Sequence, residues 1–371
     1  MARERQSIAS RLTEEACAHR LEFDTSQQEA AQRLDDLSIR IVDQSQSMGH
    51  KLRLHLSRLS GLQLVSALPG LYLWGGVGRG KTMLMDMFYD SLPEGLAERM
   101  HFYRFMRAVH AHLREIKQRT EPLDTVAGRL AARMRVLCLD EFFVSDIADA
   151  MILAGLFEGL FRRGVTLVAT SNIPPRELYQ DGLQRQRFLP AIDLLQLHLD
   201  IVHLNGYVDY RLRQLQRAPT YLDSTVPETA AQLRNRFAAL AGGSSAGPVT
   251  LLVEDRPIKA QATGAGLVWL EFNDICEGPR SQNDYIELAR LYHTVFISNI
   301  PQFSTINENA ARRFIMLIDE FYDRNVNIVV SAAAPPHLLY RGEGLRVEFL
   351  RAASRLVEMQ TQQYLAGEHR P

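Results

Sequence analysis

The sequence has few lysines, few cysteines and no excess of either charge. Four of its 371 residues are lysines, so a site that needs a compact ammonium group must use Lys51, Lys81, Lys117 or Lys259. The three cysteines lie far apart and form no CxxC pair, which argues against a disulfide framework or a zinc site. With 42 basic and 43 acidic residues the formal net charge is −1, and this balance predicts no nucleic-acid partner.

Long hydrophobic runs are also missing, at the N-terminus and in the interior of the chain. No apolar run reaches the length of a membrane span, and the first residues lack the apolar segment that secretory signals carry. We therefore expect a cytoplasmic protein without a transmembrane segment. Hydrophobic residues still make up 46% of the chain, which excludes disorder as the dominant state and allows a sizeable core.

Residues 61–215 alternate between short apolar runs and helical patterns. Four of the runs are expected to be strands: 71–74, 101–105, 136–139 and 166–170. A helical pattern over 82–92 follows the first of them. Continuous apolar strands separated by helices are typical of a parallel sheet covered on both faces, so we predict an α/β core over these residues.

The rest of the chain has other patterns. Residues 1–60 predict an N-terminal helical segment, in which Asp24-Thr25-Ser26 can cap the second helix with Gln28 in its first turn. Residues 216–285 contain three strand-like runs, 249–253, 258–262 and 267–272, and predict a small antiparallel insert. Residues 286–371 return to mixed α/β, so we expect four segments in all.

The last segment repeats a pattern of the core. Residues 317–340 align without gaps on 156–179, with identical pairs that include a Pro-Pro turn after the strand. Extended back, this register sets 297–340 on 136–179. Two interpretations are open: a degenerate duplication, or two similar strand–turn units of one sheet. We favour the second, because one short match is thin support for a duplication.

One segment of the core points to phosphate binding. Its sequence, Gly75-Gly76-Val77-Gly78-Arg79-Gly80-Lys81-Thr82, fits the pattern G-x-x-x-x-G-K-[ST] and stands between an apolar strand and a helical run. Glycines let the backbone curl so that successive N–H groups converge on phosphate oxygens, and the following helix adds its positive end. Lys81 would supply charge to the outer phosphates, and the Thr82 hydroxyl would ligate Mg²⁺.

Polar residues follow two other predicted strands. Asp140 and Glu141 end one apolar run, and the carboxyl ends of parallel strands meet at the edge where the phosphate loop lies. Asp140 would hold Mg²⁺, directly or through water, and Glu141 would orient and deprotonate an attacking water. Asn172 follows the next strand, where it would sense the γ-phosphate or, alternatively, cap the Pro174-Pro175 turn.

The nucleotide and the reaction follow from what surrounds this loop. Many GTP-binding proteins carry an N-K-x-D motif, and no lysine of this chain lies in that pattern, so we expect ATP. A glutamate next to the metal carboxylate favours hydrolysis over transfer to a small molecule. Arg185 and Arg187 are candidates for an arginine finger supplied by a neighbouring subunit, or else are surface arginines.

These segments resemble one family, the ZapE/AFG1-like P-loop ATPases of the AAA+ class. The resemblance runs from near Asp24 to Tyr364, and its most specific strings are 70–86, 139–151 and 169–179. It implies an AAA+ P-loop NTPase core and a ring-forming homo-oligomer. Carried over by position, it makes Asn172 sensor 1, Arg185 or Arg187 the finger, and Arg355 sensor 2, with Arg312-Arg313 as an alternative.

The resemblance also implies partners. Bacterial members are linked to the cytokinetic Z-ring and its tubulin-like polymer, and mitochondrial relatives to protein quality control. We therefore expect Mg-dependent ATP hydrolysis, with ATP and Mg²⁺ as cofactors, coupled to remodelling of a protein partner, the division polymer being the first candidate. Two alternatives stay open: a quality-control ATPase, and a non-catalytic adaptor module that ATP only switches.

Overall fold

The computed structural model describes most of the chain. The described residues are 7–19, 24–47, 67–76, 78–116, 121–205, 212, 215–216, 218–241, 245–264 and 266–370, with the backbone alone for 15–19. The chain divides into two compact units, residues 1–208 and 209–371, each of which has its own β-sheet.

The first unit combines N-terminal helices with an alternating α/β segment. Its helices are α1 (Ile8–His19), α2 (Thr25–Gln46), α4 (Lys81–Ser91), α5 (Phe102–Glu115), α6 (Pro122–Arg133), α7 (Ile147–Arg162) and α8 (Leu189–His198). Its strands are β1 (Gly70–Trp74), β2 (Ala97–His101), β3 (Val136–Asp140), β4 (Thr166–Ser171) and β5 (Leu199–His203). Two short 3-10 helices, η1 (Pro175–Glu177) and η2 (Arg185–Arg187), follow β4.

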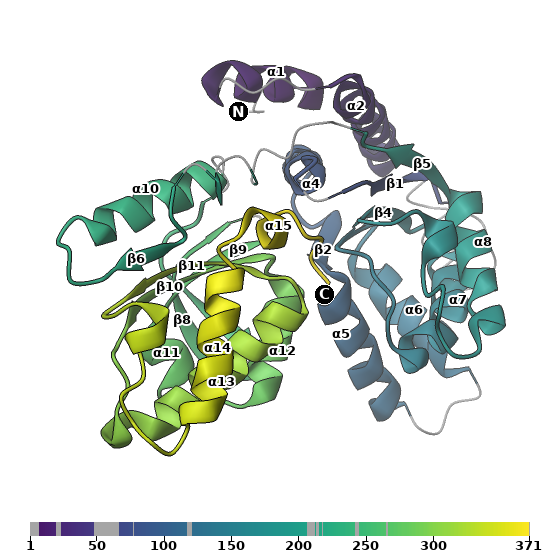
Figure 1. The fold of residues 1–371 in the computed structure, drawn as a ribbon. Helices are drawn as coiled ribbons and strands as arrows, with labels where there is room; N and C mark the ends of the chain where they lie inside the picture. Colours follow the sequence, from purple (N-terminus) through teal and green to yellow (C-terminus); the bar gives the residue numbers. More distant parts are fainter. Residues whose placement is uncertain are drawn as a thin grey trace. The chain divides into compact units, whose positions relative to one another are not determined.

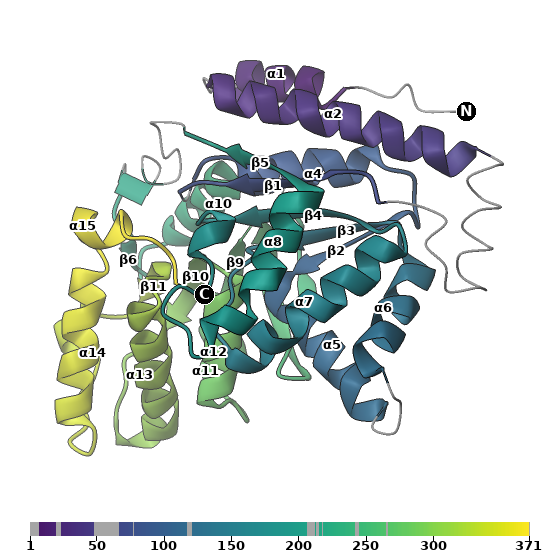
Figure 2. The ribbon, with the colours of Figure 1, turned by 90° about the vertical axis from the view of Figure 1, so that its right-hand side faces the viewer.

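The five strands of this unit form one parallel sheet in the order β2-β3-β4-β1-β5. Helices α1, α2 and α4 cover one face, and α5 to α8 cover the other (Figures 1 and 2). Alternate residues of β1 serve the two cores: Leu71 and Leu73 pack with the first group of helices, and Tyr72 packs with the second. The prediction of a parallel sheet covered by helices on both faces is confirmed.

One predicted strand is wrong. Residues 102–105 begin helix α5, and the strand before it is β2, which ends at His101. The apolar residues Phe102, Phe105, Met106 and Val109 have helical spacing, and all are buried on one face of α5. Strand β2 is polar and only partly buried because it lies at the edge of the sheet, so its sequence lacks the apolar signal of the inner strands.

Helix α2 begins with a capping box. The Asp24 carboxylate accepts from the Gln27 N–H at 2.9 Å, and Gln27 Oε1 accepts from the Asp24 N–H at 3.0 Å. The predicted cap is therefore confirmed, but the side chain that completes it is Gln27, which is buried, and not the exposed Gln28.

The second unit is built around a larger sheet. Its strands are β6 (Tyr221–Asp223), β7 (Val249–Val253), β8 (Arg256–Gly264), β9 (Leu267–Glu271), β10 (Thr294–Ile300) and β11 (Asn327–Ala332). Its α-helices are α10 (Thr229–Ala241), α11 (Phe272–Cys276), α12 (Gln282–Leu291), α13 (Glu308–Asp323), α14 (Arg346–Glu358) and α15 (Gln362–Leu365). Its 3-10 helices are η3 (Thr305–Asn307) and η4 (Pro336–Leu338).

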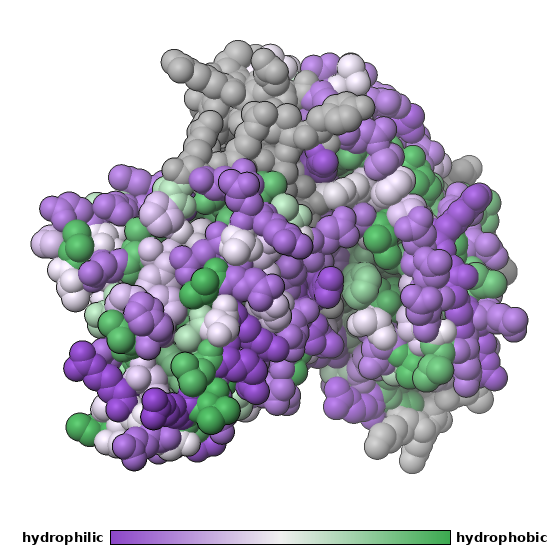
Figure 3. Space-filling view, in the orientation of Figure 1, coloured by the Kyte–Doolittle hydropathy of each residue, from purple (hydrophilic) through white to green (hydrophobic). Residues whose placement is uncertain are grey.

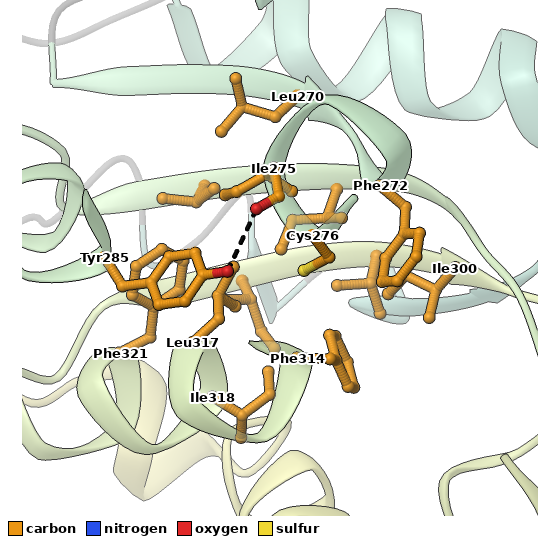
Figure 4. Close-up of a cluster of buried hydrophobic side chains, with 14 of the residues drawn as sticks. Leu270, Phe272, Ile275, Cys276, Tyr285, Ile300, Phe314, Leu317, Ile318 and Phe321 are labelled. Carbon is orange, nitrogen blue, oxygen red and sulfur yellow. Dashed lines mark hydrogen bonds between the residues drawn. The ribbon is translucent and has the colours of Figure 1, made fainter. Parts of the chain in front are cut away.

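These strands run in the order β6-β11-β10-β9-β8-β7, with β7 to β9 antiparallel and β9, β10, β11 and β6 parallel. The expected antiparallel strands are thus present, and β9 joins them to β10 in one sheet. A large core lies between this sheet and helices α11 to α14 (Figure 4). In it the Tyr285 hydroxyl donates to the Ile275 carbonyl at 3.1 Å, which satisfies a polar group among apolar neighbours.

The internal repeat falls on two different sheets. Helix α7, strand β4 and turn η1 belong to the first unit, whereas the matching α13, β11 and η4 belong to the second. Our favoured interpretation, two strand–turn units of one sheet, is wrong. The aligned residues Thr170 and Ser331 each accept from a backbone N–H at the end of the neighbouring strand, that of Glu141 at 3.1 Å and that of Asn299 at 3.0 Å, although Asn299 lies three positions before Gln302, the residue aligned with Glu141. These matches favour a degenerate duplication.

The exposed surface is of mixed polarity, and the cysteines whose side chains are described form no disulfide. Hydrophobic side chains are scattered among hydrophilic ones on the face in Figure 3, and α14 exposes Val347, Leu350 and Val357. Cys138 and Cys276 are free and buried, and the Cys17 side chain lies outside the described residues. Across the described part of the chain, no helix combines the length and apolar character needed to span a membrane.

Candidate nucleotide site

The predicted phosphate loop connects β1 to α4, and its backbone needs glycine. Gly75, Gly78 and Gly80 have φ angles of +148°, +77° and +78°, a region that side chains disfavour. A Cβ on Gly75 would also lie 2.5 Å from the Leu204 carbonyl oxygen. These glycines therefore permit the curled loop that the motif predicts. Val77, predicted to contribute a backbone N–H, lies outside the described residues.

Lys81 and Thr82 stand in the first turn of α4. The Lys81 ammonium donates to the carbonyl oxygens of Gly75 and Gly76 at 2.5 and 2.7 Å, so it is folded back over its own loop. Because α4 begins at Lys81, the loop joins directly to the positive end of the helix. Both residues are thus at the place where a phosphate group would lie.

Asp140 ends β3 and is held by an arginine that sequence reasoning missed. Arg99 Nε, from β2, donates to Asp140 Oδ2 at 2.7 Å, and the same guanidinium pairs with Asp86 of α4. Burial disfavours the charge on Arg99, but Asp140 and Asp86 together raise the pKa of its guanidinium. Burial raises the pKa of Asp86, and Arg99 opposes that rise. Arg99 therefore holds a buried carboxylate, Asp140, and a partly buried one, Asp86, with one cation.

The second oxygen of Asp140 fits a metal ligand. Asp140 is 5% exposed, and its Oδ1 is buried without a hydrogen-bond partner among the residues that the structure describes. An unpaired buried carboxylate oxygen is costly unless a cation or donor meets it. Within the same residues, no group of three or more acidic, histidine or cysteine side chains could hold a metal. A site with one carboxylate and one hydroxyl suits Mg²⁺, which keeps waters and phosphate oxygens as its other ligands.

Glu141 has a fixed backbone. Its φ is +52°, and its N–H donates to Thr170 Oγ1 of β4. The next residue is also tied to β4, because the Phe142 carbonyl accepts from Ser171 Oγ at 2.8 Å. These bonds fix the turn that carries Glu141 against the end of the neighbouring strand. Asn172 comes directly after that strand and is partly exposed.

The sheet brings the three predicted segments to one edge. Strand β4 lies between β3 and β1, with Leu139 opposite Ala169 and Trp74 opposite Ser171. The Gly75 N–H donates to the Ser171 carbonyl at 3.3 Å, which ties the start of the loop to the end of β4. The phosphate loop, the acidic pair and Asn172 therefore share the carboxyl edge of the sheet, where open α/β sheets bind ligands.

The predicted arginines lie in different places. Arg187, in η2, is exposed, whereas Arg185 is partly buried and donates to the Arg176 carbonyl at 2.6 Å. Arg355 belongs to α14 of the second unit, where it pairs with Asp319 at 2.8 Å and Asp323 at 3.3 Å. It also lies over the Tyr322 ring. These contacts explain Arg355 as a residue of the α13–α14 packing, and its role as sensor 2 stays a prediction.

A glycine-rich loop between a strand and a helix, acidic residues after β3, and a five-stranded parallel sheet with β4 in its centre together define a P-loop NTPase. A sequence profile of the AFG1-like ATPase family matches residues 6–368. The chain therefore belongs to this family and is an ATP-hydrolysing enzyme.

Individual relatives agree with this assignment. The chain is 51% identical over 300 residues to the Cell division protein ZapE of Escherichia coli K12, covering 81% of this chain and 80% of that protein. It is 38% identical over 341 residues to Lactation elevated protein 1 homolog B of Danio rerio, covering 80% and 68%. Domain III of Thermotoga maritima DnaA overlays on 53% of this chain and 83% of its own, with a TM-score of 0.33 and 17% identity. This TM-score is too low to add to the assignment.

Proposed function

We propose that the chain couples Mg-dependent ATP hydrolysis to remodelling of a protein partner in bacterial cell division, the tubulin-like polymer of the Z-ring. The observation that carries the catalytic part is the common edge at which the phosphate loop, Asp140-Glu141 and Asn172 meet. The partner is supported by 51% identity to a relative named as a cell division protein.

In this proposal each residue has one task. The loop from Gly75 to Gly80 and the Lys81 ammonium bind the phosphates, and Lys81 exchanges its two carbonyl contacts for phosphate oxygens. Thr82 and Asp140 would hold Mg²⁺, which neutralises charge on the phosphates when bound. Glu141 takes the proton of the water that attacks the γ-phosphorus, as the bond to the β-phosphate oxygen breaks.

One of the remaining tasks, that of the arginine finger, needs a second subunit. We infer a homo-oligomer, in the cytoplasm, in which Arg187 of one subunit reaches the γ-phosphate held by the next, because Arg187 is exposed and Arg185 is engaged in its own unit. Asn172 would contact the γ-phosphate and the attacking water. Hydrolysis would then change the angles between subunits and the surface offered to the partner.

Steady-state ATP hydrolysis by the purified protein, with and without the polymerised division protein, tests the proposal. Glu141→Gln is the blank, since it keeps the loop and lacks the base, and Lys81→Ala tests the assigned phosphate site. Turnover that rises with the polymer supports the whole proposal. Turnover that the polymer does not change argues against this partner, and turnover no higher than Glu141→Gln would instead favour an ATP-switched adaptor.

A further inference from the structure

The N-terminal helix α2 touches the phosphate loop through one buried side chain. Gln27 is 4% exposed, and its Nε2 donates to the carbonyl oxygen of Arg79 at 2.9 Å. A Cβ on Gly80 would lie 3.2 Å from the same Nε2, so the amide lies close against the loop backbone. A buried amide from a distant segment is thus hydrogen-bonded to the last peptide of the loop before Lys81.

The other end of this amide is fixed as well. Gln27 Oε1 accepts from the Asp24 N–H at 3.0 Å, as part of the capping box of α2. Ser26, one residue earlier, accepts from the Asn205 N–H just after β5 at 3.1 Å. The start of α2 is therefore joined to both the phosphate loop and the end of the neighbouring strand, which leaves the Gln27 side chain little freedom to move.

The bond to Arg79 has a consequence for the loop. In a planar trans peptide the C=O and the following N–H point in opposite directions. When Gln27 holds the Arg79 carbonyl toward α2, the Gly80 N–H points to the side away from α2. Gly80 has a φ of +78°, and glycine restricts its backbone less than other residues do, so the bond from Gln27 limits the rotation of this peptide.

We propose that Gln27 is a positioning residue of the ATP site: through the Arg79 carbonyl it fixes the last peptide of the phosphate loop in the orientation that binds phosphate. The inference rests on the proposed ATP site at this loop. It makes the start of α2 a part of the nucleotide site, although Gln27 and Arg79 are 52 residues apart in sequence.

The test is a pair of identical substitutions at neighbouring positions. Gln27→Glu keeps the size and the acceptor Oε1 but replaces the donor with a carboxylate oxygen, which repels the Arg79 carbonyl. Gln28→Glu adds the same charge on an exposed position of the same turn. We expect Gln27→Glu to weaken binding of a fluorescent ATP analogue about tenfold and to raise KM equally, with kcat within about threefold of the parent. Gln28→Glu should match the parent.

The outcomes separate positioning from stability. The melting temperature of each nucleotide-free variant is measured alongside its ATP affinity. If Gln27→Glu does not fold, Gln27→Met replaces it in the same binding and turnover measurements, since it removes both hydrogen bonds without adding charge. If folded Gln27 variants bind ATP as tightly as the parent, whether or not they melt at a lower temperature, the positioning role of Gln27 is wrong and the proposed ATP site stands. ATP binding by the parent that is no stronger than by Lys81→Ala overturns the proposed site, and the inference with it.

Discussion

Arg99 Nε lies 2.7 Å from Asp140 Oδ2, and the other end of the same guanidinium pairs with Asp86. One cation on an edge strand thus serves a carboxylate at the end of β3 and another on the helix that follows the phosphate loop. His101, opposite Asp140 in the sheet, adds no charge there, because burial lowers the pKa of its imidazole. Arg99 orients Oδ2 and leaves Oδ1 free to meet the Mg²⁺ of the proposed site.

Arg99→Met is expected to lower the free energy of unfolding by about 3 kcal/mol, because it leaves Asp86 and Asp140, whose side chains are 28% and 7% exposed, without their shared cation. Chemical denaturation measures this loss. ATP turnover should fall in the fraction that is folded. Adding Asp86→Asn should restore part of the stability, since it removes one of the stranded charges.

Arg133→Met is the control for Arg99→Met. Arg133, at the end of α6, pairs with Glu98, the neighbour of Arg99 in β2. The Arg133 side chain is 64% exposed, so its loss should change the free energy of unfolding by well under about 1 kcal/mol. If the two substitutions lowered the free energy of unfolding equally, the ion pairs of Arg99 would contribute no more than an ordinary surface pair. A double variant no more stable than Arg99→Met would contradict the shared-cation explanation.

Thr170→Val tests whether the backbone bond to Glu141 matters for catalysis. The substitution keeps the shape of a side chain that is 2% exposed but removes the oxygen that accepts from the Glu141 N–H. We expect kcat to fall about tenfold with KM for ATP unchanged, because the turn that carries the proposed base, Glu141, loses its anchor. Thr170→Ser keeps the hydroxyl and should retain parental kcat; a loss in Thr170→Ser equal to that in Thr170→Val would refute the anchoring role.

His198→Phe should make the unfolding free energy less sensitive to acid. Burial lowers the pKa of His198 below its ordinary 6.5, and its ring stacks on Phe161 with centroids 4.1 Å apart. Above pH 6.5 the imidazole is neutral in both states and its full contribution is present. As the pH falls below that value, the unfolded chain takes up a proton that the folded chain resists, so stability is lost.

Phenylalanine keeps the stacking of position 198 but has no proton to bind. Denaturation midpoints measured between about pH 7.5 and 5.5 should therefore fall less in His198→Phe than in the parent. Parallel pH curves for the two proteins would mean that the charge of His198 plays no part in acid sensitivity.

The segments predictable from sequence are those where several local signals agree. The phosphate loop combines required glycines, a rare lysine and a flanking strand and helix, so its position followed from residues 70–92 alone. The strands that lead to Asp140 and Asn172 are buried along their whole length and have apolar centres, because they are inner strands of a parallel sheet. Their shared edge followed from the rule that parallel strands end together.

Three features were beyond this reasoning for physical reasons. Strand β2 is polar because it is an edge strand, so the apolar window at 101–105 was assigned to a strand although Phe102 begins a helix. Arg99 had no signal, since its importance comes from two carboxylates distant in sequence. Gln27 had a local signal, because Asp24 and a glutamine three residues later form a capping-box pattern. Its bond to Arg79 joins residues distant in sequence, and no local pattern indicates it.

Mixing two inactive variants tests the proposed arginine finger. Arg187→Ala should bind ATP normally and lose turnover by about 1,000-fold, because the finger stabilises charge only in the transition state. Lys81→Ala lacks the phosphate site but keeps Arg187. If the finger acts across subunits, mixed oligomers will contain sites with an intact loop from one variant and an intact Arg187 from the other.

The mixture should then recover a measurable part of parental ATP turnover, and the recovery should depend on the ratio of the two variants. Arg185→Ala mixed with Lys81→Ala is the comparison, since Arg185 is held by the Arg176 carbonyl of its own unit. Recovery with Arg185→Ala but not with Arg187→Ala would exchange the two assignments. No recovery in either mixture, with both variants folded and exchanging subunits, would show that neither arginine acts across a subunit boundary.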